Sequence, residues 1–203
     1  MDGNTLSPKV RFERYCDDIV IHCRSQKQAL YLKSKVIGRM AECKLEINEG
    51  KTHVVYCKNE QNAERAHQKV SYNFLGYTLR PKLSLTKHGL KLLTAACMSH
   101  SSKLDVRGKI RKMPIRKFQG NIQQLAEKIN VPVRGWINYY CKFNKWTTVG
   151  IWWYLQRKVI EWVVKIKKIG KYKAIDWLIT VYQNRPNLMS HWHLTPPTLV
   201  GRR

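Results

Sequence analysis

Residues 10–23 read VRFERYCDDIVIHC. Apolar and polar side chains alternate on both sides of the Asp17-Asp18 pair, which is the period of β-strands. Because this polar pair falls between two such runs, the stretch predicts a β-hairpin with two carboxylates at its tip. Paired carboxylates on a tight turn suit a Mg²⁺ site for nucleotidyl transfer, although Asp-rich turns are also common without a metal.

The sequence after this hairpin predicts a small mixed region. Ser25 followed by Gln28 is typical of a capping box, and apolar residues at three- and four-residue spacing predict a helix that ends near Cys43 and packs on the hairpin. Further strands are expected at residues 45–47, 52–57 and 90–93, and a glycine-interrupted aromatic strand at 72–79.

Beyond about residue 96 the apolar spacing becomes helical. Helices are expected at residues 103–111, 121–140, 151–168 and 171–183, and all seven tryptophans lie in this part. Some of these rings must form a core, and others, interleaved with lysines, suit stacking on bases. The fold class expected is α+β, with one domain at residues 1–95 and an all-helical one at 96–203.

The net charge of the chain indicates the class of its binding partner. The chain has 38 Lys and Arg against 13 Asp and Glu, a formal charge of +25, and residues 101–203 alone carry 21 against four, or +17. Such a charge favours a polyanion, and RNA and DNA fit these totals equally well.

Several protein classes are excluded or disfavoured. No apolar stretch is long enough to span a membrane, and the first ten residues lack a signal-peptide core, so we expect a soluble cytoplasmic protein without membrane partners. Six cysteines without a C-x-x-C pair predict reduced thiols. His191 and His193 supply only two of the roughly four ligands that zinc takes, so no metal is assigned to them.

Four blocks in a fixed order resemble the reverse transcriptase/maturases of group II introns. They are RYCDDIVIHC (14–23), MAECKLEINEGKTHVVYC (40–57), VSYNFLGYTLRP (70–81) and VPVRGWINYYCKF (131–143). The resemblance implies a truncated palm, an antiparallel sheet with one helix, followed by a helical thumb/maturase domain. It also implies RNA-directed DNA synthesis and the binding of group II intron RNA.

Carried over residue by residue, the resemblance makes Asp17 a catalytic ligand of Mg²⁺, with Asp18 beside it. Phe74, Leu75, Gly76 and Tyr77 would form a primer-grip-like strand. Lys51 would lie near the incoming triphosphate, although a lysine in a solvated turn is an equally good interpretation. The residues expected to contact RNA are Arg134, Lys142, Arg107, Lys109, Arg111 and Lys112. Trp136 and Tyr140, four residues apart, are expected in the core rather than on a stacking platform.

One part of the family pattern is missing from the sequence. A two-metal polymerase needs a carboxylate from a second segment, and in the family that segment precedes the Tyr-x-Asp-Asp hairpin. Asp2, Asp105 and Asp176 are poor replacements, so no polymerase activity is expected from this chain alone. Three alternatives follow: an RNA-binding splicing helper, a polymerase completed by an upstream fragment in trans, or a decayed or split reading frame. The sequence leaves the oligomeric state open.

Overall fold

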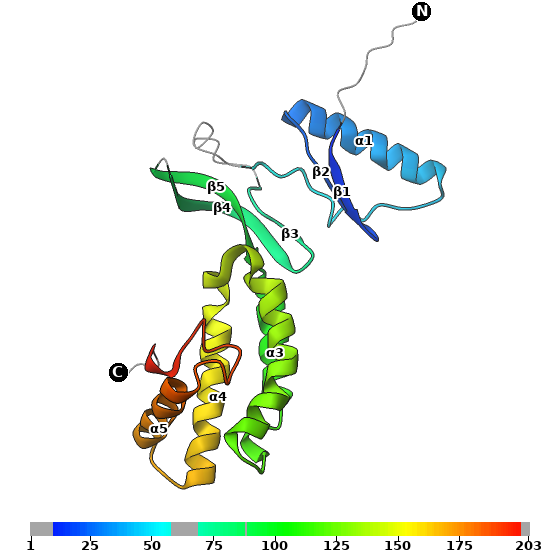
Figure 1. Ribbon diagram of the computed structural model, residues 1–203. Coiled ribbons are helices and arrows are strands. Elements are labelled where there is room, and N and C mark those ends of the chain that lie inside the picture. Colours follow the sequence, from blue (N-terminus) through cyan, green and yellow to red (C-terminus); the bar gives the residue numbers. More distant parts are fainter. Residues whose placement is uncertain (1–9, 58–68, 88, 200–203) are drawn as a thin grey trace, which may run out of the picture. The chain divides into compact units, whose positions relative to one another are not determined.

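The computed structural model describes residues 10–57, 69–87 and 89–199, and the chain divides into two compact units. Unit 1 comprises residues 1–74 and 81–94, and unit 2 comprises residues 75–80 and 95–203. Unit 1 contains the first hairpin and one helix, whereas unit 2 contains four α-helices (Figure 1). The fold class is therefore α+β, as the sequence predicts.

The predicted carboxylate hairpin is present. Strands β1 (Phe12–Tyr15) and β2 (Asp18–Ile21) pair antiparallel, with Tyr15 opposite Asp18. A two-residue connection of this kind needs a positive φ, and Cys16 supplies it with φ of 52°. The side chains of Glu13 and His22 form a further hydrogen bond near the open end.

Helix α1 (Gln26–Glu42) begins where the capping pattern predicts. The Ser25 hydroxyl accepts a hydrogen bond from the Gln28 amide at 3.2 Å, and the Gln28 side chain accepts one from the Arg24 amide at 2.8 Å. The face that carries Ala29, Leu32 and the following apolar positions is half-buried, but no residue of α1 is buried. The helix is therefore correctly predicted, although its packing on the hairpin is incomplete.

The strands predicted at residues 45–47 and 52–57 do not form. Residues 52–57 are rich in the β-branched and aromatic side chains that favour strands, but a β-ladder also requires a partner along its length. The backbone hydrogen bond from the Tyr56 amide to the Lys69 carbonyl, at 2.8 Å, joins this segment to another part of unit 1. Because no described strand pairs with residues 52–57, this segment stays a loop.

The aromatic stretch at residues 72–79 is a β-hairpin rather than one interrupted strand. Strand β3 (Tyr72–Phe74) ends at a turn formed by Leu75 and Gly76, and β4 (Tyr77–Thr86) follows. Both turn residues have positive φ, 49° and 76°, which is the geometry of tight hairpin turns. Strand β5 (Gly89–Met98) is longer than the predicted 90–93 segment and completes a three-stranded sheet in the order β3-β4-β5.

The four predicted helices of the second half all form. They are α2 (His100–Lys112), α3 (Ile122–Asn144), α4 (Val149–Lys167) and α5 (Lys171–Asn184). Ser99 caps α2, and Asn121 with Gln124 forms a reciprocal capping box at the start of α3. Short 3₁₀ turns at Ile115–Lys117 (η2) and Lys145–Thr148 (η3) precede α3 and α4.

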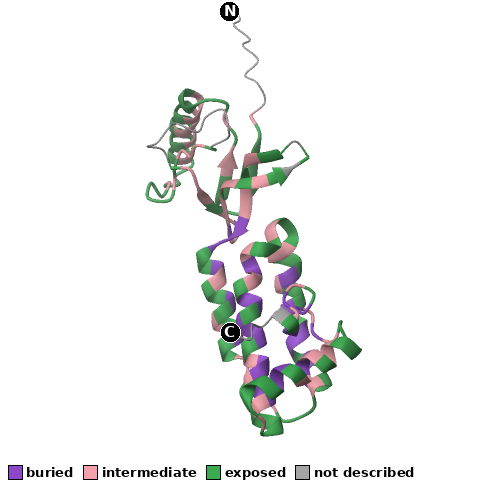
Figure 2. Cartoon of the chain, turned by 90° about the vertical axis from the view of Figure 1, so that its left-hand side faces the viewer, coloured by how far each residue is buried: buried purple, intermediate pink, exposed green. Residues whose placement is uncertain are grey.

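Buried side chains are confined to unit 2, as Figure 2 shows for the described residues. Its core contains Trp152, Trp162 and Trp192, each at most 2% exposed, together with aliphatic residues of all four α-helices. No described residue of unit 1 is buried. Since the burial of apolar surface drives folding, unit 2 holds nearly all of the stabilising core.

A hydrogen-bonded polar group lies inside this core. The Gln156 side-chain oxygen accepts hydrogen bonds from Trp192 Nε1 at 2.9 Å and from His191 Nε2 at 2.8 Å. All three side chains are fully buried, whereas His193 is exposed. The His-Trp segment therefore anchors the C-terminal region on α4. Among the described residues, His191 and His193 belong to no group of three or more potential metal ligands.

Burial makes the stability of unit 2 depend on pH. Desolvation, with a smaller effect from His193, lowers the pKa of His191 to about 3 from the ordinary 6.5. In the unfolded chain the imidazole therefore takes up a proton at a pH where the folded chain does not. The contribution of the neutral His191 to the stability of the folded chain is complete above pH 6.5 and is lost as the pH decreases toward 3.

We expect the free energy of unfolding to fall by about 1.4 kcal/mol from this group between pH 7.5 and 5.5. Urea titrations monitored by tryptophan fluorescence at both pH values measure it. In a His191→Gln variant the other titrating groups are retained, so the difference in pH dependence isolates His191. Equal pH dependence in both proteins would contradict the assignment.

The Gly76 turn is held closely against α2. The Gly76 carbonyl accepts hydrogen bonds from the Ser99 amide at 3.0 Å and the Ser102 hydroxyl at 2.9 Å. A Cβ atom at Gly76 would lie 2.9 Å from the Ser102 hydroxyl oxygen and 3.4 Å from the Tyr140 hydroxyl oxygen. Both the positive φ and this close approach therefore require glycine.

We expect Gly76→Ala to destabilise the protein by about 1–3 kcal/mol, because it adds backbone strain and displaces the Ser102 hydroxyl. Gly89→Ala is the matched control, since φ there is also positive, at 96°, but no atom lies within 4 Å of the added Cβ. Thermal unfolding of both variants separates the two causes. Equal destabilisation would show that backbone strain alone matters.

Candidate carboxylate hairpin and nucleic-acid interface

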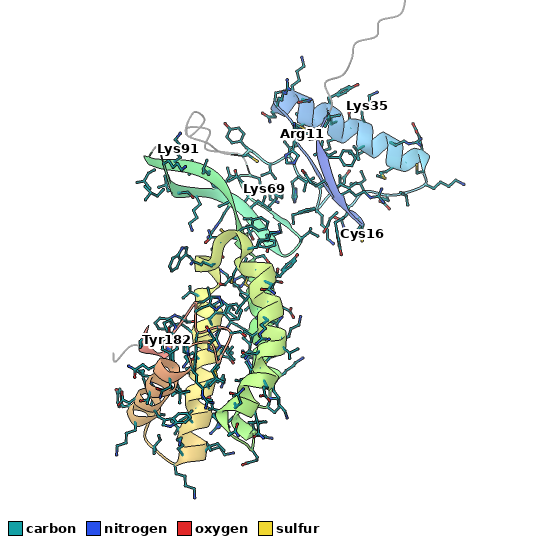
Figure 3. All side chains as sticks on the ribbon, in the orientation of Figure 1. Arg11, Cys16, Lys35, Lys69, Lys91 and Tyr182 are labelled. Atoms are coloured by element: carbon teal, nitrogen blue, oxygen red, sulfur yellow. The ribbon has the colours of Figure 1, made fainter. Side chains whose placement is uncertain are left out.

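Asp17 and Asp18 lie at the end of the β1–β2 hairpin. Asp17 belongs to the turn, Asp18 is the first residue of β2, and both are exposed. The Arg14 side chain donates a hydrogen bond from Nε to the Cys16 carbonyl at 3.1 Å and so braces the turn. Cys16, labelled in Figure 3, marks the end of the hairpin. The two carboxylates are thus presented to solvent on a defined turn.

A Mg²⁺ site at these carboxylates stays a prediction. Mg²⁺ is commonly held by one or two protein carboxylates together with substrate phosphates and water, which this pair matches. Within the described ranges, no three His, Cys, Asp or Glu side chains gather as a metal cluster. Asp105 and Asp176 lie on α2 and α5 of unit 2, and Asp2 lies outside the described residues. A two-metal site needs at least one carboxylate beyond this pair.

Lys51 lies in a turn of unit 1. Its amide donates hydrogen bonds to the carbonyl and the side-chain oxygen of Asn48, both at 3.1 Å, and its side chain is exposed. This geometry agrees with a solvated turn and leaves the ammonium group accessible. Its role near a triphosphate stays a prediction.

The turn of the predicted primer-grip-like segment is fixed by α3. The Tyr139 hydroxyl donates to the Leu75 carbonyl at 2.8 Å, and the Tyr77 hydroxyl donates to the Tyr139 carbonyl. Burial, followed by nearby tyrosines and Cys141, raises the pKa of Tyr77, which keeps this hydroxyl protonated as a donor. Leu75, Gly76 and Tyr77 are therefore positioned by helices of unit 2, a coupling that strand periodicity does not reveal.

The predicted RNA contacts are all exposed side chains of unit 2. Arg107, Lys109, Arg111 and Lys112 lie on α2, and Arg134 and Lys142 lie on α3. The Lys109 ammonium contacts the Asp105 carboxylate at 2.7 Å, and this hydrogen bond and charge raise the pKa of Lys109. Lys109 is thus partly neutralised, whereas Arg134 donates to the Ser190 hydroxyl at 3.1 Å.

Arg134 also borders a groove of about 480 Å³ between α3 and the segment after α5. Arg185 lies on its other side, and Glu127 is the acidic side chain in its lining. Asn130 ties the two walls together, since its side chain donates to the Leu188 carbonyl and accepts from the Ser190 amide, each at 2.8 Å. Sequence spacing gave no indication that Arg185 lines the same groove as Arg134.

A second group of cations was not predicted. The cationic groups of Arg107, Arg157 and Lys158 lie 5.0, 5.3 and 5.8 Å from the centre of the Tyr154 ring. Cation–π attraction holds each of them over the same ring. Arg157 and Lys158 follow Tyr154 at three and four residues, so helical spacing could have indicated their shared face, but their proximity to Arg107 depends on how α2 packs.

The aromatic residues of unit 2 differ in how far they are exposed. Trp136 and Tyr140 are half-buried and pack against the core, which confirms the prediction for this pair. Trp146 is 72% exposed and Trp153 is 43% exposed, whereas the core tryptophans are inaccessible. No helix in the described part of the chain is both long and apolar enough to cross a membrane.

Comparison with known proteins gives two family matches and no match among curated proteins. Residues 3–79, which contain the carboxylate hairpin, match the family of reverse transcriptases (RNA-dependent DNA polymerases). Residues 104–177, which cover most of α2, all of α3 and α4 and the first half of α5, match the group II intron maturase-specific domain. The chain therefore belongs to the group II intron reverse transcriptase/maturases and has the segment order of their C-terminal part.

Proposed function

We propose that this chain binds structured group II intron RNA through the helical unit and thereby stabilises the folded intron. The observation that carries the proposal is the charge of the maturase-specific segment. Residues 104–177 contain 17 Lys and Arg but only four Asp and Glu, a net charge of +13. All of these basic side chains except Lys158 are exposed. Such a surface attracts phosphates and releases counterions when it binds them.

The cations around Tyr154 support phosphate binding in particular. Lys158 is paired with the Glu161 carboxylate at 2.9 Å, whereas the two arginines carry like charges around one ring, and a phosphate placed between them would relieve their repulsion. Arginine also suits phosphate because its planar guanidinium group can make two parallel hydrogen bonds. We therefore assign Arg107 and Arg157 to contacts with the RNA backbone.

We also propose that residues 1–95 form the palm part and residues 96–203 the thumb/maturase domain.

We expect the triple variant Arg107→Gln, Arg111→Gln, Arg157→Gln to weaken binding to a group II intron transcript. Each lost phosphate contact lowers the slope of log K against log salt by roughly 0.7–0.9, so the slope should decrease by about 2–3. Filter binding over a salt series measures both quantities.

The matched control is Lys27→Gln with Lys35→Gln, which removes exposed charges from α1 of unit 1. We expect the control to change the slope by less than half as much per charge, because non-contacting charges act only through the general field. Binding of the wild-type chain that is absent, or independent of salt, would refute the proposed function.

A second candidate is a polymerase whose catalytic site is completed by another polypeptide segment, in the same chain or in trans. The favouring observation is that unit 1 has no buried described residue and exposes large apolar side chains, including Phe12 (63%), Tyr15 (61%) and Leu30 (53%). An isolated two-stranded hairpin is marginal in water. A partner segment that covered these residues would supply the missing core.

In such an assembly Asp17 and Asp18 would hold Mg²⁺ together with phosphate oxygens of the nucleotide. The metal, when bound, neutralises charge that develops during phosphoryl transfer. The chain's own contribution is to present both carboxylates on a braced turn. The Leu75-Gly76 turn, held by Tyr139 and Ser102, would position the primer end.

We expect primer extension on an RNA template with Mg²⁺ only when a fingers and upper-palm fragment from a related enzyme is added. Asp17→Asn should then reduce the rate by more than about 100-fold, because a metal ligand is lost. Asp176→Asn, an equivalent change on α5, should not. Activity that survives Asp17→Asn would exclude this candidate, and no activity with any fragment would leave RNA binding as the function.

A further inference from the structure

One surface of α3 and η3 carries three exposed aromatic side chains, which we call the aromatic stripe: Tyr139, Phe143 and Trp146. Their side chains are 46%, 63% and 72% exposed. Tyr139 and Phe143 are four residues apart on α3, the spacing that places side chains on one face of a helix, and Trp146 follows in η3. The stripe lies opposite the core-facing positions of α3, which include Val133 and Ile137.

The exposure of Trp146 stands out within the chain. Three of the seven tryptophans are at most 2% exposed, so the core has ample capacity for this residue type. Trp146 instead leaves most of a large apolar ring in water, which costs about 25 cal/mol for each Å² left uncovered. Phe143, three residues earlier, is exposed as well, so Trp146 is not an isolated exposed ring in this part of the chain, and exposed apolar groups of this kind mark binding sites.

Two rings of the stripe, those of Tyr139 and Phe143, pack against Tyr77, which is 7% exposed. Its ring centre lies 5.5 Å from that of Tyr139 and 5.4 Å from that of Phe143, the latter in an edge-to-face arrangement. The Tyr77 hydroxyl also donates to the Tyr139 backbone. Rings fixed in this way lose little conformational entropy when a ligand covers their outer faces.

Cations flank the stripe. The Lys142 ammonium lies 5.9 Å from the centre of the Phe143 ring, and the Lys145 ammonium lies 5.3 Å from that of Trp146. The sequence has no Asp or Glu from residue 128 to residue 160. A ligand with flat apolar faces and attached negative charges matches this arrangement, and unpaired nucleotides have both properties.

We propose that the aromatic stripe binds unpaired bases of single-stranded RNA by stacking, with Lys142 and Lys145 on the adjoining phosphates. The proposal rests on the proposed RNA binding and assigns a separate task to this surface: the cations around Tyr154 hold backbone phosphates, whereas the stripe distinguishes single-stranded from paired RNA. Base stacking on aromatic side chains tolerates every sequence, so the stripe recognises strandedness rather than sequence.

The test uses the full chain and two RNA probes of equal length. One is an unstructured oligonucleotide of ~12 nucleotides, within the range of known single-strand sites, and the other is its blunt duplex. We expect Trp146→Ala and Phe143→Ala each to weaken single-strand binding by about 5- to 150-fold, the range typical of one stacked base, and duplex binding by less than about two-fold. Trp146→Phe should retain most of the affinity because it keeps an aromatic face.

Trp153→Ala is the matched control, since Trp153 is 43% exposed on α4 and lies outside the stripe. This variant should leave the affinity for both probes unchanged. Lys145→Gln should weaken both probes, because both contain phosphates. Circular dichroism verifies that each variant keeps its helical content.

Three results would overturn the proposal. The first is single-strand binding unchanged in Trp146→Ala while the wild-type chain binds. The second is equal loss for single strand and duplex, which would make the stripe a general contact. The third is a concentration-dependent dimer in sedimentation that Trp146→Ala abolishes without any effect on RNA, which would assign the stripe to a second copy. Absence of wild-type binding to both probes, while a group II intron transcript is still bound, would reject the stripe alone. Absence of binding to the transcript as well would reject the proposed RNA binding.

Discussion

Tyr77 makes the contacts on which the functional face of unit 2 depends. Its hydroxyl bonds to the backbone of α3, and its ring supports Tyr139 and Phe143. Through Tyr139 the same contacts reach the Leu75 carbonyl. One buried phenol therefore fixes the hairpin turn, the end of α3 and an exposed aromatic surface at the same time. A change at any of these positions should be transmitted to the other two.

The helical half of the fold could be predicted well because its signals are local. Helical spacing of apolar residues located α2 to α5, and the Ser25 capping pattern located α1. The β-structure was harder to predict, because a strand depends on a partner that may lie far away in the sequence. Residues 52–57 have the composition of a strand and form no ladder. Leu75 adopts a positive φ that its side chain disfavours and that no sequence pattern indicated.

The candidate sites could likewise be predicted only where their residues are close together in the sequence. The exposed tip of the carboxylate hairpin followed from sequence, because its two residues are adjacent in the chain. Groupings that form only after the helices pack did not follow from sequence, among them Arg107 with Arg157 around Tyr154 and Arg134 with Arg185 along one groove. Nor could the sequence tell which tryptophans are exposed. Trp146 and Trp152 are six residues apart, and one is exposed whereas the other is buried because only Trp152, on α4, packs into the core.

The shortage of acidic residues across residues 128–160 also affects how the chain responds to ordinary buffers. Without RNA, dissolved ions screen the mutual repulsion of the surface cations and should favour the compact state. With RNA, the same ions compete for the phosphates and remove a ligand that stabilises the native fold. Ionic strength thus acts in opposite directions on the free and the bound protein, and storage conditions that protect one will weaken the other.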